Sequence, residues 1–211
     1  MISLGGVRNV IFDFGGVLFD IDYDLPAQAF ERLGFRGFRD LYTQANQNPI
    51  FDLLETGKVS NEEFLDFLHS HVPNATRQEV FDAWNVILLT ILPEQVQVAH
   101  DLRKQGMRTF LLSNTNAIHV GEFERMIAET MDFNVFRESF EKIYYSNVIG
   151  LKKPHPETFL EVCKWNGLVP SETLFIDDSK QHVDGALLAG LKAYHLKPGE
   201  RVSELFSAAK G

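Results

Sequence analysis

The sequence predicts an α/β protein in which helices cover both faces of a parallel sheet and a further block of helices is inserted after the first strand. Short runs of β-branched and aromatic residues alternate with segments of helical periodicity, an order typical of parallel βαβ units. A long stretch, residues 18–91, has helical character and separates the first strand from the second. The chain has 211 residues, 45% of them hydrophobic, which is enough for one domain with a large insertion.

The first strand is predicted at residues 7–14, a buried run that ends at Gly15 and Gly16. Beyond the insertion, Pro93 suits the first turn of a helix that runs to about Gly106. Strands and helices then alternate to the C-terminal part of the chain. The strands are expected at residues 107–112, 142–145, 173–176 and 192–196, and the helices at residues 117–131, 156–166 and 179–189.

Two capping boxes mark helix starts inside the insertion. Ser60 is followed three residues later by Glu63, and Thr76 by Glu79, each ahead of an apolar helical stripe. We therefore expect two parts: a Rossmann-like three-layer core formed by residues 1–17 and 92–211, and an α-helical cap domain formed by residues 18–91.

Composition and charge exclude several classes of function. The net charge is -9, whereas nonspecific binding to nucleic acid or to an anionic membrane favours a basic protein. No apolar run approaches the ~18 residues of a membrane span, and Asp13 interrupts the apolar run near the start, unlike in a signal peptide. The single cysteine, Cys163, excludes an internal disulfide and a cysteine zinc cluster. We expect a cytoplasmic protein, a monomer or a weak homodimer, without nucleic-acid or membrane partners.

Polar side chains follow successive strands of the predicted sheet. Asp13 ends the first strand, the pair Ser113 and Asn114 follows the second, Lys152 and Lys153 follow the third, and Asp177 and Asp178 follow the fourth. In open α/β sheets, ligands bind beyond the carboxyl ends of the strands. We therefore expect these groups to meet at one edge of the sheet. They are a carboxylate, a hydroxyl, an amide, an ammonium group and an acidic pair.

This set of groups suits phosphoryl chemistry with Mg²⁺. A hard cation prefers carboxylate and carbonyl oxygens, together with water and phosphate oxygens. Neighbouring carboxylates repel one another unless a cation lies between them. Hydroxyl, amide and ammonium groups can hold the remaining phosphoryl oxygens. An aspartate in line with the phosphorus can act as a nucleophile and form an aspartyl-phosphate.

The chain resembles the haloacid dehalogenase superfamily of phosphatases and other hydrolases. The resemblance covers nearly the whole chain, including the helical insertion after the first motif. The motifs are residues 12–17 (FDFGGV), 112–116 (LSNTN), 152–154 (KKP) and 175–178 (FIDD). With residues 17–22 (VLFDID), they look most similar to the branch that contains bacterial α-D-glucose-1-phosphate phosphatase and the N-terminal phosphatase domain of soluble epoxide hydrolase.

The resemblance implies a metal site formed by four residues. Asp13 would be both the nucleophile and a Mg²⁺ ligand, and the carbonyl oxygen of Gly15 would be a second ligand. Asp178 would bind the metal directly, and Asp177 either directly or through water.

The resemblance also implies a phosphate-binding set. Ser113 and Asn114 would hold the phosphoryl group, and Lys153 would neutralise it and orient Asp13. Lys153 is preferred to Lys152 because the family's lysine usually directly precedes the proline.

Two positions depart from the family pattern. Gly15 stands where the family's phosphatases usually carry a second aspartate as general acid and base, although the glucose-1-phosphate phosphatase branch also has glycine there. Asp20 or Asp22 is a candidate replacement that could reach the leaving oxygen. His182 stands where the fourth motif usually has Asn or Asp, which alters the surroundings of the metal site.

The function expected from these observations is a Mg²⁺-dependent phosphatase for a small phosphorylated metabolite, such as the sugar phosphate glucose 1-phosphate, acting through an aspartyl-phosphate. Two alternatives stay open. Gly15 and His182 motivate a non-catalytic protein that binds a metabolite. A metal-independent 2-haloacid dehalogenase uses the same nucleophile, but Asp177 and Asp178 would repel its carboxylate substrate. His119 either lines the site or faces solvent, and Cys163 is expected to be packed in a helix.

Overall fold

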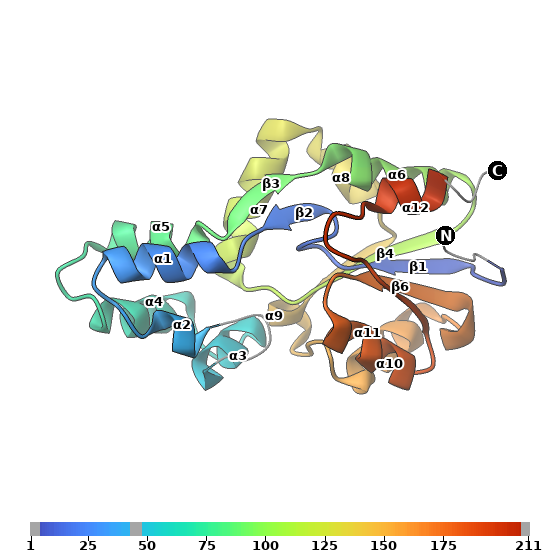
Figure 1. The fold of residues 1–211 in the computed structure, drawn as a ribbon. Coiled ribbons are helices and arrows are strands. Elements are labelled where there is room, and N and C mark those ends of the chain that lie inside the picture. Colours follow the sequence, from blue (N-terminus) through green and yellow to red (C-terminus); the bar gives the residue numbers. More distant parts are fainter. Residues whose placement is uncertain (1–4, 43–47, 208–211) are drawn as a thin grey trace.

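The computed structural model describes residues 5–42 and 48–207. Within these residues, a five-stranded parallel sheet has the strand order β5–β4–β1–β6–β7 (Figure 1). The central strand β1 is hydrogen-bonded to β4 on one side and to β6 on the other, so the groups that follow these three strands lie side by side. The strands are β1 (Asn9–Phe12), β4 (Arg108–Ser113), β5 (Lys142–Tyr145), β6 (Thr173–Asp177) and β7 (Lys192–His195).

Helices cover both faces of the sheet, which confirms the predicted three-layer α/β core. In β1, Val10 and Phe12 pack into the hydrophobic cluster on one face, and Ile11 packs into the cluster on the other. The first face is covered by α6 (Pro93–Lys104), α7 (Ala117–Thr130), α8 (Phe133–Glu138) and α12 (Val202–Ser207). The second face is covered by α10 (Pro156–Asn166) and α11 (Lys180–Leu188). Two short elements, α9 (Ser146–Ile149) and the 3₁₀ turn η1 (Pro170–Glu172), complete this part.

The insertion after β1 forms its own group of helices beside the carboxyl edge of the sheet (Figure 1). Its helices enclose a largely aromatic hydrophobic cluster, in which Phe30 and Phe38 stack with ring centroids 4.4 Å apart. The helices are α1 (Asp24–Arg32), α2 (Phe38–Leu41), α3 (Pro49–Glu55), α4 (Asn61–Ser70) and α5 (Arg77–Asn85). The exact division of the chain at residues 17/18 and 91/92 stays a prediction.

The ends of the insertion are strands, which the sequence analysis did not predict. The strands β2 (Phe19–Ile21) and β3 (Leu88–Ile91) pair antiparallel, with Phe19 opposite Ile91. Both of these side chains are buried. The runs are too short to show a period of two, and burial of their side chains against the core outweighs the helical pattern around them.

Both predicted capping boxes are present. The Ser60 hydroxyl accepts a bond from the backbone N–H of Glu63 at 3.2 Å, and the Glu63 carboxylate accepts the backbone N–H of Ser60 at 2.9 Å. Thr76 and Glu79 form the same reciprocal pair at the start of α5. These side chains satisfy backbone N–H groups that the first helical turn leaves without partners.

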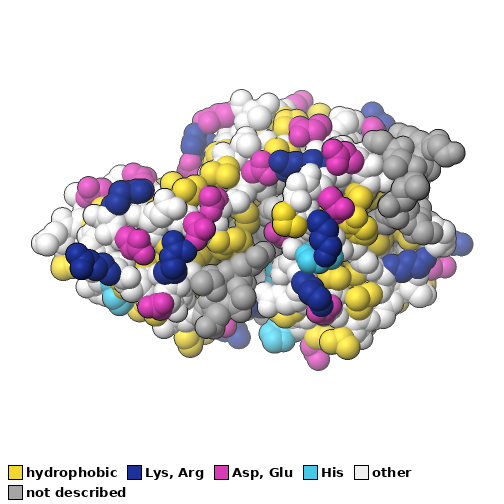
Figure 2. Space-filling view, in the orientation of Figure 1, with side chains coloured by type: hydrophobic (Ala, Val, Ile, Leu, Met, Phe, Trp, Pro, Cys, Tyr) yellow, Lys and Arg dark blue, Asp and Glu magenta, His cyan; other side chains and the backbone are white. Residues whose placement is uncertain are grey.

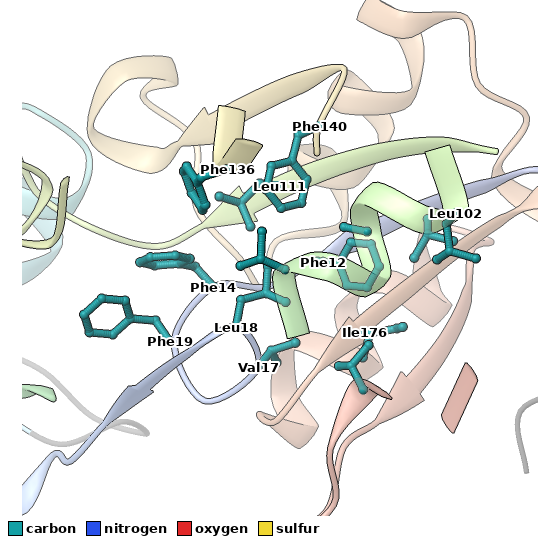
Figure 3. Packing of buried hydrophobic residues seen from close by; sticks show 14 of the residues in the cluster. Phe12, Phe14, Val17, Leu18, Phe19, Leu102, Leu111, Phe136, Phe140 and Ile176 are labelled. Carbon is teal, nitrogen blue, oxygen red and sulfur yellow. The ribbon is translucent and has the colours of Figure 1, made fainter. Parts of the chain in front are cut away.

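Phenylalanines anchor the segment that leaves β1. Phe14 contacts the rings of Phe19, Phe123 and Phe136, with centroids 5.2, 4.7 and 6.1 Å away. Figure 3 shows how Phe14 and Phe19 lie beside Phe136 in this part of the core. Because Phe14 directly follows Asp13, these contacts hold the end of β1 against α7 and α8.

The charged side chains are mixed over the surface, and the lengths and composition of the helices can be compared with those of membrane spans. On the face drawn in Figure 2, Lys and Arg side chains are interspersed with Asp and Glu and do not form a broad basic patch. Among the described residues, no helix combines the length and the apolar character needed to cross a membrane.

The aromatic anchor gives a first prediction. Phe123→Ala would remove the ring that contacts Phe14, Phe19 and Tyr145 and leave a cavity in the core. We expect the free energy of unfolding, measured by urea denaturation, to fall by about 3–5 kcal/mol. The control Leu188→Ala changes a side chain that is 79% exposed and should alter stability by less than about 0.5 kcal/mol. Equal losses for the two variants would contradict the described packing.

Candidate active site

A buried lysine joins two of the predicted carboxylates. Lys153 Nζ lies 2.6 Å from Asp13 Oδ1 and 2.8 Å from Asp177 Oδ2. The side chains of Lys153 and Asp177 are fully buried, and that of Asp13 is 9% exposed. Buried charges are tolerated only when they are paired in good geometry, so these three side chains form one electrostatic unit. The structure places Lys153, and not Lys152, beside Asp13.

Asn114 fixes the backbone that carries this lysine. Its side-chain oxygen accepts the Lys153 N–H at 2.9 Å, and its amide nitrogen donates to the Lys153 carbonyl oxygen, also at 2.9 Å. The following Lys153–Pro154 peptide is cis. In this arrangement Asn114 positions Lys153, and its predicted contact with a phosphoryl group stays a prediction. The neighbouring Ser113 ends β4 and is buried, with its hydroxyl 3.5 Å from the Asn114 carbonyl oxygen.

Asp177 is held in its ionised form by several donors. Its Oδ1 accepts the backbone N–H of Ser179 at 2.7 Å, and His182 Nδ1 lies 3.1 and 3.0 Å from Oδ1 and Oδ2. Burial alone would raise the pKa of Asp177, but the Lys153 ammonium and the His182 bond outweigh it and hold this pKa well below the usual range. His182 therefore orients Asp177, a predicted metal ligand.

Asp13 has the opposite electrostatic balance. Burial and the nearby Asp177 carboxylate raise the pKa of Asp13 well above its ordinary value, although Lys153 acts against them. Burial also disfavours the charged form of Lys153, but Asp13 and Asp177 outweigh this effect and raise the pKa of the lysine. One ammonium group thus pairs with two carboxylates, so the cluster carries a net negative charge when both carboxylates are ionised.

The donor set fits a divalent cation. Among the described residues, one ligand atom from each of Asp13, Asp177 and His182 lies within 4.8 Å of the others. Asp178 follows directly and packs against Gly16, where a Cβ atom would lie 2.4 Å from Asp178 Oδ2. Gly16 also has a φ of +75°, so glycine serves both the turn and this close approach. Converging carboxylates with too little positive charge are suited to a hard cation with oxygen ligands.

The Ile21 side chain packs against Gly15. A Cβ atom at position 15 would lie 2.7 Å from Ile21 Cδ1, the flexible end of that side chain, so a larger residue there would require Ile21 to move. The candidate replacements Asp20 and Asp22 each have a partner. Asp20 pairs with Arg201 at 2.9 Å, and Asp22 Oδ1 accepts the backbone N–H of Asp24 at 2.8 Å. That one of them serves the leaving oxygen stays a prediction.

Tyr23 and Lys152 have surroundings that the sequence did not predict. Burial above all raises the pKa of Tyr23, and the nearby groups Tyr42, Glu55, Asp178 and Asp13 add to the effect. Lys152 Nζ contacts Asp52 at 2.6 Å and Glu55 at 2.5 Å, both on α3. No motif marks Tyr23 in the sequence, and the partners of Lys152 lie about a hundred residues away in the chain.

His119 neither lines the site nor faces solvent. Its ring stacks on Trp84 of α5 with centroids 4.7 Å apart, and its Nε2 lies 3.3 Å from the Trp84 carbonyl oxygen. Its Nδ1 lies 3.0 Å from the amide nitrogen of Asn116, so the neutral ring accepts there and donates to Trp84. Burial lowers the pKa of His119 to about 4. His119 thus joins the insertion to α7. Cys163 is packed as predicted, and burial raises the pKa of its thiol to about 11.

Comparison with known proteins identifies the family. Residues 7–190 match the family of haloacid dehalogenase-like hydrolases, and the chain belongs to this family. D-ribitol-5-phosphate phosphatase from Bacteroides thetaiotaomicron is 31% identical over 194 residues, which cover 92% of this chain and 93% of that protein. Phosphoglycolate phosphatase from Pseudomonas fluorescens is 32% identical over 198 residues, covering 91% and 70%. The expected family and the expected class of hydrolase are confirmed, while the narrower branch stays a prediction.

Solved structures agree with this assignment. A haloacid dehalogenase family enzyme from Bacteroides thetaiotaomicron, crystallised as an aspartate-to-alanine mutant with magnesium and inorganic phosphate, is 29% identical. It matches with a TM-score of 0.84 over 95% of this chain and 98% of its own. An L-2-haloacid dehalogenase from Xanthobacter autotrophicus matches with a TM-score of 0.59 and 19% identity over 97% and 83% of the chains, which shows the fold alone.

The pKa of His119 gives a prediction about stability. The folded protein favours the neutral ring, because its pKa of about 4 lies below the ordinary value of 6.5. Stability is therefore unaffected well above pH 6.5 and falls as the pH drops from 6.5 towards 4, by about 3 kcal/mol in total. Urea unfolding of the wild type and of His119→Phe between pH 7 and pH 4 tests this. The variant should lack this part of the decline, and identical pH profiles would show that His119 is not buried in neutral form.

Proposed function

We propose that the protein is a Mg²⁺-dependent phosphatase that hydrolyses a small phosphorylated metabolite, in particular a sugar or polyol phosphate. The observation that carries the proposal is the buried Lys153 ammonium bonded to Asp13 and Asp177. Magnesium in the related crystal structure and the phosphatase names of the related proteins support it. We further propose that it acts as a cytoplasmic monomer or weak homodimer.

In the proposed reaction, an oxygen of Asp13 attacks the phosphorus in line. The bond from phosphorus to the ester oxygen breaks, an aspartyl-phosphate forms, and the metabolite leaves as an oxyanion that takes a proton from water. Water then cleaves the aspartyl-phosphate, which releases inorganic phosphate and restores Asp13. Lys153 keeps the Asp13 carboxylate in place throughout, and the Ser113 hydroxyl and the Asn114 amide are proposed to bind phosphoryl oxygens.

Asp13, Asp177, Asp178 and the carbonyl of Gly15 would hold Mg²⁺, which supplies charge neutralisation for the phosphoryl oxygens. Asp13 must be ionised to attack, and its raised pKa would fall beside a divalent cation. The same cation would balance the carboxylates that Lys153 alone leaves in excess.

The leaving group must depart without an acid at position 15. A general acid is worth ~10²–10⁴ in rate, and its absence matters least for a leaving oxygen of low basicity, such as a sugar anomeric oxygen. Glucose 1-phosphate therefore stays a candidate substrate, beside the ribitol 5-phosphate named for the related protein.

The first test measures release of inorganic phosphate from ribitol 5-phosphate, glucose 1-phosphate and 2-phosphoglycolate, with Mg²⁺ or with EDTA. We expect release that EDTA abolishes and that Asp13→Asn lowers by more than about 10³-fold, because the nucleophile is lost. Asp184→Asn changes an exposed carboxylate on α11 and should leave the rate unchanged. Equal release by the wild type and Asp13→Asn would refute the proposal, and binding of these esters without turnover would favour the non-catalytic alternative.

A second test measures metal binding without turnover. Mg²⁺ at about 100 times its Kd should raise the free energy of unfolding by about 2.7 kcal/mol, because it binds the folded carboxylate cluster only. The shift should be much smaller in Asp178→Asn, which removes one proposed ligand, and unchanged in Asp184→Asn. If Mg²⁺ stabilises Asp178→Asn as much as the wild type, the metal does not bind where we propose.

A further inference from the structure

The two outer strands of the sheet end in polar side chains that bond to the loops of their inner neighbours. The strand β5 pairs with β4, and β7 pairs with β6, so their carboxyl ends lie at the edge of the proposed reaction centre. Ser146 directly follows β5, and His195 is the last residue of β7. Neither residue lies within a family motif.

The Ser146 hydroxyl forms two hydrogen bonds with the backbone of Thr115. It accepts the Thr115 N–H at 2.9 Å and donates to the Thr115 carbonyl oxygen at 3.0 Å. Ser146 is fully buried, so removal of its hydroxyl would leave both backbone groups without a partner. Thr115 directly follows Ser113 and Asn114, which are proposed to bind phosphoryl oxygens. The loop of residues 113–116 is thus fixed from the side of β5.

The same loop is connected to the proposed nucleophile by hydrogen bonds. The Asn114 side chain forms two bonds of 2.9 Å with the Lys153 backbone, and Lys153 Nζ lies 2.6 Å from Asp13 Oδ1. A shift of the backbone at Thr115 would therefore move Asn114 and, through it, the lysine that orients Asp13. Such shifts are costly, because a misplacement of about 1 Å in a reacting geometry can lower a rate by about 10²-fold.

His195 acts in a similar way on the loop that follows β6. Its Nε2 lies 2.9 Å from the Asp178 carbonyl oxygen, and Lys197 Nζ lies 2.8 Å from its Nδ1. Because an ammonium group can only donate, Nδ1 accepts, and Nε2 carries the proton that is donated to Asp178. The backbone N–H of Leu196 also donates to the Asp177 carbonyl oxygen at 2.9 Å. The end of β7 therefore fixes the backbone of both acidic residues.

We propose that Ser146 and His195 are positioning residues for the two halves of the reaction centre. Ser146 holds the loop that binds the phosphoryl group, and His195 holds the loop that carries the metal ligands. This inference rests on the proposed phosphatase function. Since the two residues belong to opposite outer strands, their effects are separable: loss of Ser146 should weaken phosphate binding, and loss of His195 should weaken Mg²⁺ binding.

The test measures two dissociation constants for each variant. The Kd of Mg²⁺ is obtained from the rise in the free energy of unfolding with Mg²⁺ concentration, and the Kd of inorganic phosphate from calorimetry at saturating Mg²⁺. Ser146→Ala should weaken phosphate binding by about tenfold and leave Mg²⁺ binding within about twofold of the wild type. His195→Ala should do the reverse, because groups that orient metal ligands are worth about 10–100-fold in affinity. His195→Gln keeps an N–H donor and should stay within about threefold of the wild type.

Turnover separates the two roles in a second way. Raising the Mg²⁺ concentration should restore the kcat of His195→Ala, because the weakened metal site is then filled. The same concentration of Mg²⁺ should not restore the kcat of Ser146→Ala, whose defect lies in the geometry of the loop and not in metal occupancy.

Two substitutions of the same kind are matched controls. Ser139 is also fully buried and donates to the Val135 carbonyl oxygen at 2.7 Å, but it lies ahead of the amino end of β5. His69 Nε2 lies 2.8 Å from the Ala75 carbonyl oxygen within the insertion. Ser139→Ala and His69→Ala should leave both dissociation constants within about twofold of the wild type, because distant sites rarely couple.

The inference is wrong if Ser146→Ala weakens phosphate binding no more than Ser139→Ala does. It is also wrong if Ser146→Ala and His195→Ala weaken both ligands alike, since the two residues would then only support the fold. Should an alanine variant be unfolded, Ser146→Cys or His195→Leu decides, because each fills more of the space without a strong donor. Failure of the phosphatase proposal is distinguishable: Asp13→Asn would then release phosphate as the wild type does, whereas both dissociation constants are measured without turnover.

Discussion

The salt bridges of Lys153 to Asp13 and Asp177 are the interaction on which the rest of the site depends. All three charged groups are buried or nearly so, and each is stable there only because the others are present. The parallel sheet supplies the geometry, because β1 and β6 are neighbours and end at the same edge. Asn114 also contributes, because its two hydrogen bonds to the Lys153 backbone hold the loop so that the lysine side chain points inward. A single ammonium between two carboxylates also leaves the charge deficit that suits a divalent cation.

The neighbouring residues Lys152 and Lys153 contact different parts of the protein. Lys153 is directed into the core, while Lys152 reaches α3 of the insertion and pairs with Asp52 and Glu55. The segment that carries Lys153 thus also contacts α3 of the insertion. The stacked pair of His119 and Trp84 forms a second, uncharged contact between insertion and core. The insertion and the core are therefore joined by local contacts between residues that are distant in sequence.

The parts of the site that the sequence predicts are those that depend on strand ends. Asp13, Lys153 and Asp177 could be predicted together because parallel strands bring their carboxyl ends to one edge. Two other features could not be predicted: the bonds from Asn114 to the Lys153 backbone and the packing of Ile21 against Gly15. Both depend on contacts between segments that are distant in the chain, so no local sequence pattern indicates them. The strands β2 and β3 escaped prediction for the same reason, since Phe19 and Ile91 gain their burial only in the folded chain. The capping boxes at Ser60 and Thr76 were predictable because all of their partners lie within three residues.

The central claim is that Asp13 is the nucleophile of a phosphoryl transfer. Rapid acid quenching during turnover, followed by reduction with borohydride and peptide mass spectrometry, tests it most directly, because an acyl phosphate is reduced and an ordinary carboxylate is not. The account predicts that residue 13 alone is phosphorylated and is converted to homoserine, and that substrate omission abolishes the product. Turnover without modification of Asp13, or with the phosphoryl group on another residue, would contradict it.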